Sequence, residues 1–118
     1  MWGIALDNKS RIWLGGENEI AIFSADMKYQ KILSLANKAN PHTHVSTIFK
    51  DKNGILWLGL YKDGILTCDP STEKITRIEL EDKKADICCF YEENNKIWIG
   101  TQNGLYSYQN GKIAEEKE

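Results

Sequence analysis

The chain has 118 residues, of which 42% are hydrophobic and 27% charged, and its formal net charge is −2. This composition is typical of one folded globular domain, and the interspersed charges leave no basic face for nucleic acid. No stretch approaches the roughly 18 consecutive apolar residues of a membrane span, and residues 1–7 lack the basic and apolar regions of a signal peptide. We therefore expect a water-soluble chain with no nucleic-acid partner and no membrane segment.

A Trp-x-Gly triplet recurs three times along the chain. The triplets are Trp13 to Gly15, Trp57 to Gly59 and Trp98 to Gly100, so the tryptophans are 44 and 41 residues apart. This spacing is that of a four-stranded propeller blade. The pattern predicts three structural repeats, each with its tryptophan packed inside a blade, and it favours this role over carbohydrate stacking.

Each repeat opens with a short run of apolar and β-branched residues, at 3–6, 45–49 and 87–91, which predicts a first strand. An acidic residue lies six positions before each tryptophan, and a turn-tolerant residue lies three positions before it. Residues of these types at these positions are typical of the turn of a β-hairpin. We expect the acidic residues to accept hydrogen bonds from nearby backbone N–H groups; they are Asp7, Asp51 and Glu92.

The second strand carries the tryptophan and is apolar on both faces in repeat two, with Leu56 and Leu58 on one side and Trp57 on the other. An antiparallel sheet with one wet face would alternate apolar and polar residues instead. The strand must therefore be covered on both sides, as in a blade flanked by two other blades. The glycine of each triplet fits a place where another chain segment approaches closely.

Third strands are expected at 20–24, 65–68 and 105–108, and fourth strands at 29–35, 75–80 and 112–114. The last of these is short, so the third blade is expected to be weak or truncated. No window shows a long 3.6-residue apolar period, so little helix is expected. The expected fold is all-β, with three four-stranded antiparallel blades of a β-propeller in a partial ring; the blades span about 1–35, 45–80 and 87–114, before a charged tail at 115–118.

The pattern D-x-x-G-x-x-W-x-G-x-x-x-x-G-[IL] in residues 51–65 resembles the two-component-regulator propeller repeat, and it is echoed at 92–105 and 7–20. Such repeats occur in the sensor regions of bacterial hybrid histidine kinases. The resemblance implies a periplasmic propeller that binds a ligand, commonly a glycan fragment, and signals to a cytoplasmic kinase. Ser10 and Glu19 stand where the family has glycine, so distorted turns are expected in the first repeat.

Three functions follow as hypotheses: a non-catalytic ligand-sensing segment, a structural or protein-interaction scaffold, and a fragment of a catalytic propeller of the lyase or glycosidase type. No G-x-S-x-G, H-E-x-x-H or P-loop motif is present, so no enzyme activity, catalytic residue or cofactor is predicted. His42 and His44 lack a nearby third ligand, so no metal site is predicted. Cys68, Cys88 and Cys89 have no C-x-x-C spacing and are interpreted as small core residues.

The loops between second and third strands, and the links between repeats, should emerge on one rim. This rim is the predicted ligand-binding surface, for an oligosaccharide or another small ligand; the alternative is that its loops are merely solvated. Its residues are Tyr61, Lys62, Asp63, Gln102, Asn103, His42 and His44, together with Glu17 and Asn18.

Three blades are too few for a ring, since propellers have typically 4–8. The two outer faces would be apolar and open, which drives association. We expect either a homo-oligomer or the remaining blades of a longer chain; two copies joined head to tail would give six blades about a two-fold axis.

Overall fold

The computed structural model describes residues 2–116, which form three four-stranded antiparallel sheets. The first sheet contains β1 (Ile4–Leu6), β2 (Ile12–Gly15), β3 (Glu19–Phe23) and β4 (Gln30–Ser34). The second contains β5 (Val45–Lys50), β6 (Leu56–Leu60), β7 (Gly64–Asp69) and β8 (Lys74–Ile78). The third contains β9 (Ile87–Glu93), β10 (Lys96–Thr101), β11 (Gly104–Gln109) and β12 (Lys112–Glu116).

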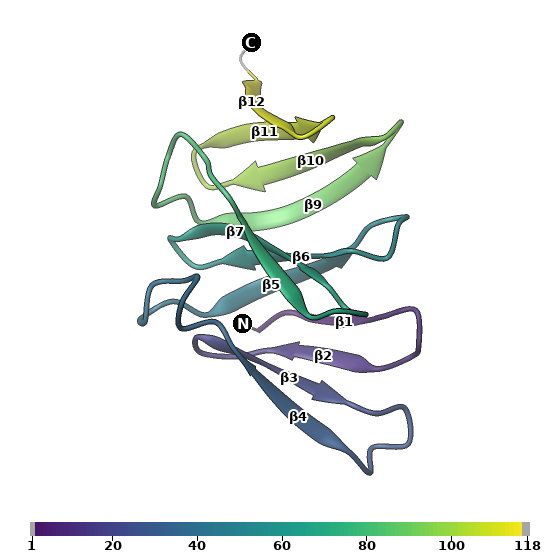
Figure 1. Cartoon of the computed structure of the whole chain (residues 1–118). Coiled ribbons are helices and arrows are strands. Elements are labelled where there is room, and N and C mark those ends of the chain that lie inside the picture. The colour runs from purple at the N-terminus through teal and green to yellow at the C-terminus, as the bar shows by residue number, and fades with distance from the viewer. Residues whose placement is uncertain (1, 117–118) are drawn as a thin grey trace.

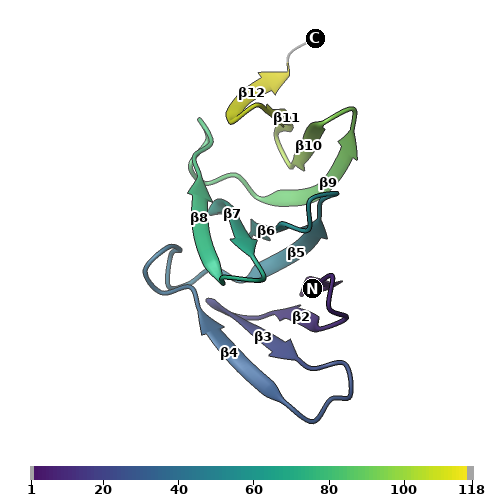
Figure 2. The ribbon, with the colours of Figure 1, turned by 45° about the vertical axis from the view of Figure 1, so that its right-hand side comes forward.

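The strands of each sheet follow one another in chain order, and the three sheets are stacked along the 48 Å dimension of the molecule (Figure 1). The first strand of each sheet lies on one side of the stack and the fourth on the opposite side (Figure 2). No helix is present between residues 2 and 116. The predicted all-β fold of three antiparallel blades is confirmed.

The fourth strand of the third sheet is complete, so the predicted truncation of this blade is wrong. β12 pairs with β11 from Gln109 opposite Lys112 to Leu105 opposite Glu116. The predicted charged tail at 115–118 therefore begins inside a strand, while residues 117–118 lie outside the described part of the chain. An outermost strand can carry charged side chains because its free edge faces water.

The first hairpin is regular although Ser10 replaces glycine. Ser10 has φ 61°, in the same left-handed region as Gly54, with φ 84°, and Asn95, with φ 65°. A non-glycine residue in this region costs about 1–2 kcal/mol. Two local bonds offset that cost, because the backbone N–H groups of Lys9 and Arg11 both donate to Asp7 Oδ1 at 2.9 Å. The expected distortion of this turn is therefore wrong.

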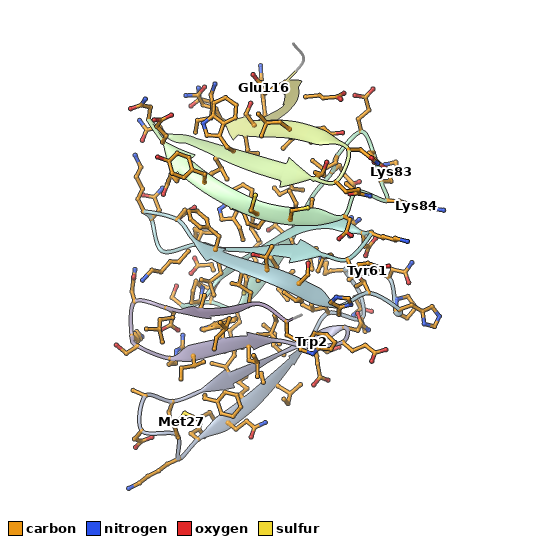
Figure 3. All side chains as sticks on the ribbon, turned by 180° about the vertical axis from the view of Figure 1, so that it is seen from behind. Trp2, Met27, Tyr61, Lys83, Lys84 and Glu116 are labelled. Carbon is orange, nitrogen blue, oxygen red and sulfur yellow. The ribbon has the colours of Figure 1, made fainter. Side chains whose placement is uncertain are left out.

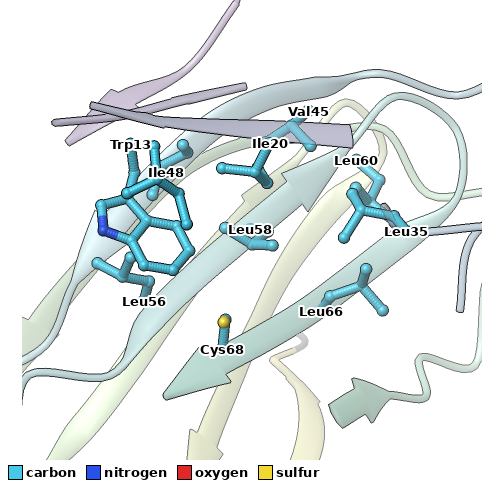
Figure 4. Close-up of a cluster of buried hydrophobic side chains, with 11 residues drawn as sticks. Trp13, Ile20, Leu35, Val45, Ile48, Leu56, Leu58, Leu60, Leu66 and Cys68 are labelled. Atoms are coloured by element: carbon cyan, nitrogen blue, oxygen red, sulfur yellow. The ribbon is translucent and has the colours of Figure 1, made fainter. Parts of the chain in front are cut away.

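The first and second sheets share one apolar core, drawn in Figure 4. Trp13 and Ile20 come from one face of the first sheet, and they pack on Leu56, Leu58 and Leu66 of the second. All five side chains are fully buried. This contact therefore leaves no water between the two sheets at these residues.

A second core joins the other face of the second sheet to the third. Trp57 and Ile65 pack there with Ile97 and Ile99. The Trp57 ring meets the Tyr108 ring edge to face, with centroids 4.9 Å apart. Every residue of β6 is buried, which confirms that this strand is covered on both sides.

Two of the triplet glycines let the next sheet approach. A Cβ on Gly15 would lie 2.6 Å from the carbonyl oxygen of Val45, and a Cβ on Gly59 would lie 2.5 Å from Thr47 Cγ2 and 2.8 Å from Ile87 Cγ2. Real Cβ atoms do not come this close to other atoms, because interiors are close-packed without overlap. Glycine at these positions sets the spacing between sheets.

Candidate functional site

At one end of the stack, the links between sheets lie against the loops that join second and third strands. The N–H of Asn18 donates to Thr43 O at 3.1 Å, and the N–H of Tyr61 donates to His44 O at 3.0 Å. In the third sheet the N–H of Gln102 donates to Asp86 O at 3.2 Å. These bonds place the loops of the predicted rim at the same end as the links.

Three aromatic rings meet on this rim, and we call Trp2, His44 and Tyr61 the aromatic cluster. The His44 and Tyr61 rings are stacked, with centroids 5.0 Å apart and planes at 13°. The Trp2 ring meets His44 edge to face at 4.7 Å. Trp2 is 49% exposed and Tyr61 39%, and the two side chains lie close together at one edge of the molecule in Figure 3. The Lys62 ammonium lies 5.2 Å from the centroid of the Tyr61 ring.

One side-chain hydrogen bond and one backbone bridge hold the cluster in place. Thr43 Oγ1 donates a hydrogen bond to Tyr61 O at 2.7 Å, and Thr43 is 2% exposed. Glu17 and His44 form an isolated antiparallel bridge between the first sheet's loop and the link. Three chain segments from two sheets therefore converge on the aromatic cluster, and a ligand would meet a preformed surface.

A hollow of about 190 Å³ adjoins the aromatic cluster. It is lined by Asn40, His42, Thr43, Tyr61 and Lys62. Pockets that enclose a whole drug-sized ligand are about 300–1,000 Å³. This hollow therefore has room for one ring or one polar group of a larger ligand.

The other predicted rim residues have different surroundings. Asp63 is held by Arg77 Nη2, which donates to its Oδ1 at 3.2 Å, and by the N–H of Asn40, which donates to its Oδ2 at 2.7 Å. Its carboxylate therefore ties the loop to the link instead of facing outward. Gln102 Oε1 accepts from the N–H of Asp86, and the N–H of Asn103 donates to Thr101 Oγ1.

The structure thus divides the predicted surface into two parts. His42, His44, Tyr61 and Lys62 gather around the aromatic cluster and its hollow. Gln102 and Asn103 lie on the loop of the third sheet, where their hydrogen bonds go to Asp86 and Thr101 and not to the cluster. Sequence reasoning missed Trp2, whose only signal was that it is the one tryptophan outside the Trp-x-Gly triplets.

The acidic residues before the tryptophans act mainly as local acceptors. Asp7 Oδ2 accepts from Trp13 Nε1 at 2.9 Å and Asp51 Oδ2 from Trp57 Nε1 at 3.0 Å, besides the backbone N–H groups of each turn. The prediction of local bonding is confirmed for these two and is wrong for Glu92. Its longer side chain reaches the neighbouring sheet, where Oε1 accepts from the N–H of Lys52 at 2.8 Å.

Burial by itself raises the pKa of the Asp7 carboxyl, but the hydrogen bonds from Trp13, Arg11 and Lys9 outweigh it and hold that pKa below its ordinary value. Asp7 is therefore ionised at neutral pH, and its charge stabilises the first hairpin. The Arg11 guanidinium is its ion partner, with Nε 2.7 Å from Oδ2.

The cysteines differ from the predicted core role at two of three positions. Cys68 is fully buried, and burial raises the pKa of its thiol to about 12. Cys88 and Cys89 are exposed. Cys88 falls at an irregularity in the pairing of β9 with β10, and Cys89 lies on the outer face of the third sheet. Within residues 2–116, no group of three or more His, Cys, Asp or Glu side chains could hold a metal ion.

The fold and its repeated Trp-x-Gly strand are those of consecutive propeller blades. The family model described as two component regulator propeller matches residues 41–62, so the chain carries this repeat in its second sheet and the link before it. No curated protein sequence matches the chain. No helix within the described residues is long and apolar enough to cross a membrane.

Solved structures from B. thetaiotaomicron have the same fold. The extracellular domain of a putative hybrid two component system is 28% identical over 98% of this chain, with a TM-score of 0.76, and 15% of that protein is covered. The extracellular domain of a putative one component system is 20% identical over 97% of this chain, with a TM-score of 0.78, and 16% of that protein is covered. The chain therefore spans about one sixth of the length of the structures it matches.

Proposed function

We propose that the chain is a non-catalytic, ligand-sensing segment of the extracellular, periplasmic sensor domain of a two-component system. The observation that carries this proposal is the propeller repeat at residues 41–62, together with the 28% identity to the extracellular domain of a hybrid two component system. The ring is completed by further blades or by a second copy. The ligand binds on the rim around the aromatic cluster.

The chemistry of the rim favours an oligosaccharide. The half-exposed rings of Trp2 and Tyr61 offer apolar surface on which the C–H face of a sugar ring can pack. His42, Lys62 and Asn40 line the adjoining hollow and supply polar groups for the hydroxyls. Since the hollow holds one ring at most, the rest of the ligand would extend along the rim.

A thermal-shift screen with a panel of oligosaccharides tests the proposal. A ligand that binds the folded chain raises its melting temperature as its concentration increases. Tyr61→Ala should abolish the shift, because it removes the ring that stacks on His44 and also lines the hollow. Tyr29→Ala is the matched control: Tyr29 is 63% exposed but lies at a turn between third and fourth strands, and its loss should leave the shift unchanged.

The absence of a shift with every oligosaccharide would contradict the proposal. It would favour the second candidate, a protein-interaction scaffold. One specific observation supports that candidate, namely the open apolar face of the first sheet, on which Ile4 is 64% and Leu6 54% exposed.

A further inference from the structure

The hollow beside the aromatic cluster is lined by cationic and polar groups and by no carboxylate. The Lys62 ammonium and the His42 imidazole line it, together with Asn40, Thr43 and Tyr61. Three other hollows on the surface, of about 140, 150 and 240 Å³, each include at least one Asp or Glu side chain. Because the whole chain has a net charge of −2, the absence of carboxylates from this hollow does not follow from composition.

The carboxylate nearest in sequence, that of Asp63, is already paired. Arg77 Nη2 donates to its Oδ1 at 3.2 Å, the N–H of Asn40 donates to its Oδ2 at 2.7 Å, and its side chain is 14% exposed. Glu17 belongs to the loop of the first sheet and does not line the hollow. Among residues 2–116, no carboxylate lies within ion-pair distance of the Lys62 ammonium. Its charge is therefore available to a ligand.

The remaining polar groups of the hollow are mainly hydrogen-bond donors. Asn40 Oδ1 accepts from the N–H of His42 at 2.9 Å, and since a backbone N–H can only donate, this bond leaves the amide NH₂ of Asn40 for a ligand. The Lys62 ammonium has three donors and no acceptor, and the His42 ring has at least one N–H. The Thr43 hydroxyl already donates to Tyr61 O. A ligand group rich in acceptor oxygens fits these donors.

The hollow is built within the chain and does not lie at either end of the stack. Its residues belong to the second sheet and to the link before it, between the first and third sheets (Figure 1). Arg77 ties both segments together, because Nη1 donates to Lys38 O of the link at 3.0 Å and Nη2 donates to Asp63 O of the loop at 2.6 Å. The donors are therefore held in a fixed arrangement before a ligand binds.

We propose that the ligand of the rim is an acidic oligosaccharide, whose carboxylate or sulfate ester lies in the hollow between Lys62, His42 and the amide of Asn40. The sugar ring next to this group packs its C–H face on Tyr61, which belongs both to the lining and to the aromatic cluster. Hydrogen bonds to anionic oxygens are stronger than those between neutral groups. This inference rests on the proposed function and narrows its ligand to one chemical class.

Isothermal titration calorimetry on the full chain tests the proposal with matched pairs of ligands. A galacturonate oligosaccharide is compared with its methyl ester, which removes the charge and keeps the ring, and a sulfated galactan oligosaccharide is compared with its desulfated form. The charged member of at least one pair should bind about ten-fold more tightly than the neutral one. Its affinity should fall as salt is added. The pair that shows the preference distinguishes a carboxylate ligand from a sulfate ligand.

Two variants test the assigned groups. Lys62→Gln should weaken binding of the acidic ligand about five-fold, and Lys62→Arg should retain most of it because the charge is kept. Asn40→Asp keeps an acceptor for the N–H of His42 but replaces the amide donor with an anionic oxygen, so it should abolish the preference for the charged ligand. Lys96→Gln is the matched control, since Lys96 also lies over an aromatic ring, 4.7 Å from the Trp98 centroid, but in the third sheet.

The melting temperature of each variant without ligand shows that it folds. Equal affinity for the charged and neutral members of both pairs would overturn this inference while the proposed function stands, and so would an acidic ligand whose affinity both variants leave unchanged. Absence of binding by every oligosaccharide, charged or neutral, would contradict the proposed function itself and this inference with it.

Discussion

The third sheet repeats the local sequence of the first two, yet its tryptophan has different surroundings. Trp13 and Trp57 are buried between sheets, and each donates its indole N–H to an aspartate six residues earlier. Trp98 is half-buried on an open face, and its corresponding acid is Glu92. Within the described residues, Glu92 bonds the backbone of Lys52 in the neighbouring sheet instead of the indole.

This difference shows which part of the motif is local and which depends on a neighbour. The hairpin turn forms in all three sheets, with left-handed residues at Ser10, Gly54 and Asn95. Burial of the tryptophan requires a following sheet, and residues 2–116 contain none beyond the third sheet. The stabilising contribution of the motif should therefore fall from the first two sheets to the third.

The largest expected difference in the free energy of unfolding is between two Trp→Ala variants. Trp57→Ala should lower the free energy of unfolding by about 3–5 kcal/mol, the usual cost of removing a large buried aromatic side chain. Trp98→Ala, which removes a half-buried ring, should cost about 1 kcal/mol. Urea denaturation in dilute solution, followed by circular dichroism, measures both. Equal losses would show that the third sheet is packed like the others.

Substitution of the triplet glycine should likewise lower stability more in the first sheet than in the third. Gly15→Ala forces a Cβ against the backbone oxygen of Val45 at 2.6 Å, and overpacking of this kind typically costs about 1–3 kcal/mol. In Gly100→Ala the one close contact of the new Cβ is the Sγ of Cys89 at 2.8 Å, an exposed side chain that can rotate away, and the Cys89 carbonyl oxygen lies at an ordinary 3.9 Å. Thermal denaturation should show a clear drop for the first variant and a small one for the second. A larger drop for Gly100→Ala would contradict the assignment of its face as open.

Stability should depend on the ionisation of Asp7. Because its pKa is lowered in the folded chain, its contribution is fully present above the unfolded pKa of about 4 and is lost as the pH falls through the folded value. Asp7→Asn should cost about 1–3 kcal/mol at neutral pH and flatten the acid limb of the stability profile. Denaturation of the parent chain and of Asp7→Asn at a series of pH values measures this. An acid limb that Asp7→Asn does not alter would contradict the role of this carboxylate.

The rate of reaction with a thiol reagent should distinguish the cysteine of the second sheet from the two cysteines of the third sheet. In dilute native protein, Cys88 and Cys89 should react before Cys68 with a thiol reagent, because both are exposed. Cys68 should react only after unfolding, since it is fully buried and its pKa is raised to about 12. A native chain in which all three cysteines react at one rate would contradict the burial of Cys68.

The repeated triplet predicted the number of sheets, and the apolar runs and turn residues around it predicted their strands and the covering of β6 on both sides, but not the full extent of β12. Apolar periodicity and turn residues determine these features locally. The aromatic cluster could not be predicted, because Trp2, His44 and Tyr61 are far apart in the sequence and meet only when two sheets pack. The exposure of Cys89 and the direction of Glu92 likewise depend on which neighbouring sheet is present.

Indole N–H exchange, followed by ¹⁵N NMR at several protein concentrations, tests the central claim most directly. The account predicts slow exchange of the Trp13 and Trp57 indole protons at every concentration. It predicts faster exchange for Trp98, because its side chain is only half-buried. Fast exchange of Trp13 or Trp57, or equally slow exchange of Trp98 in dilute solution, would contradict it.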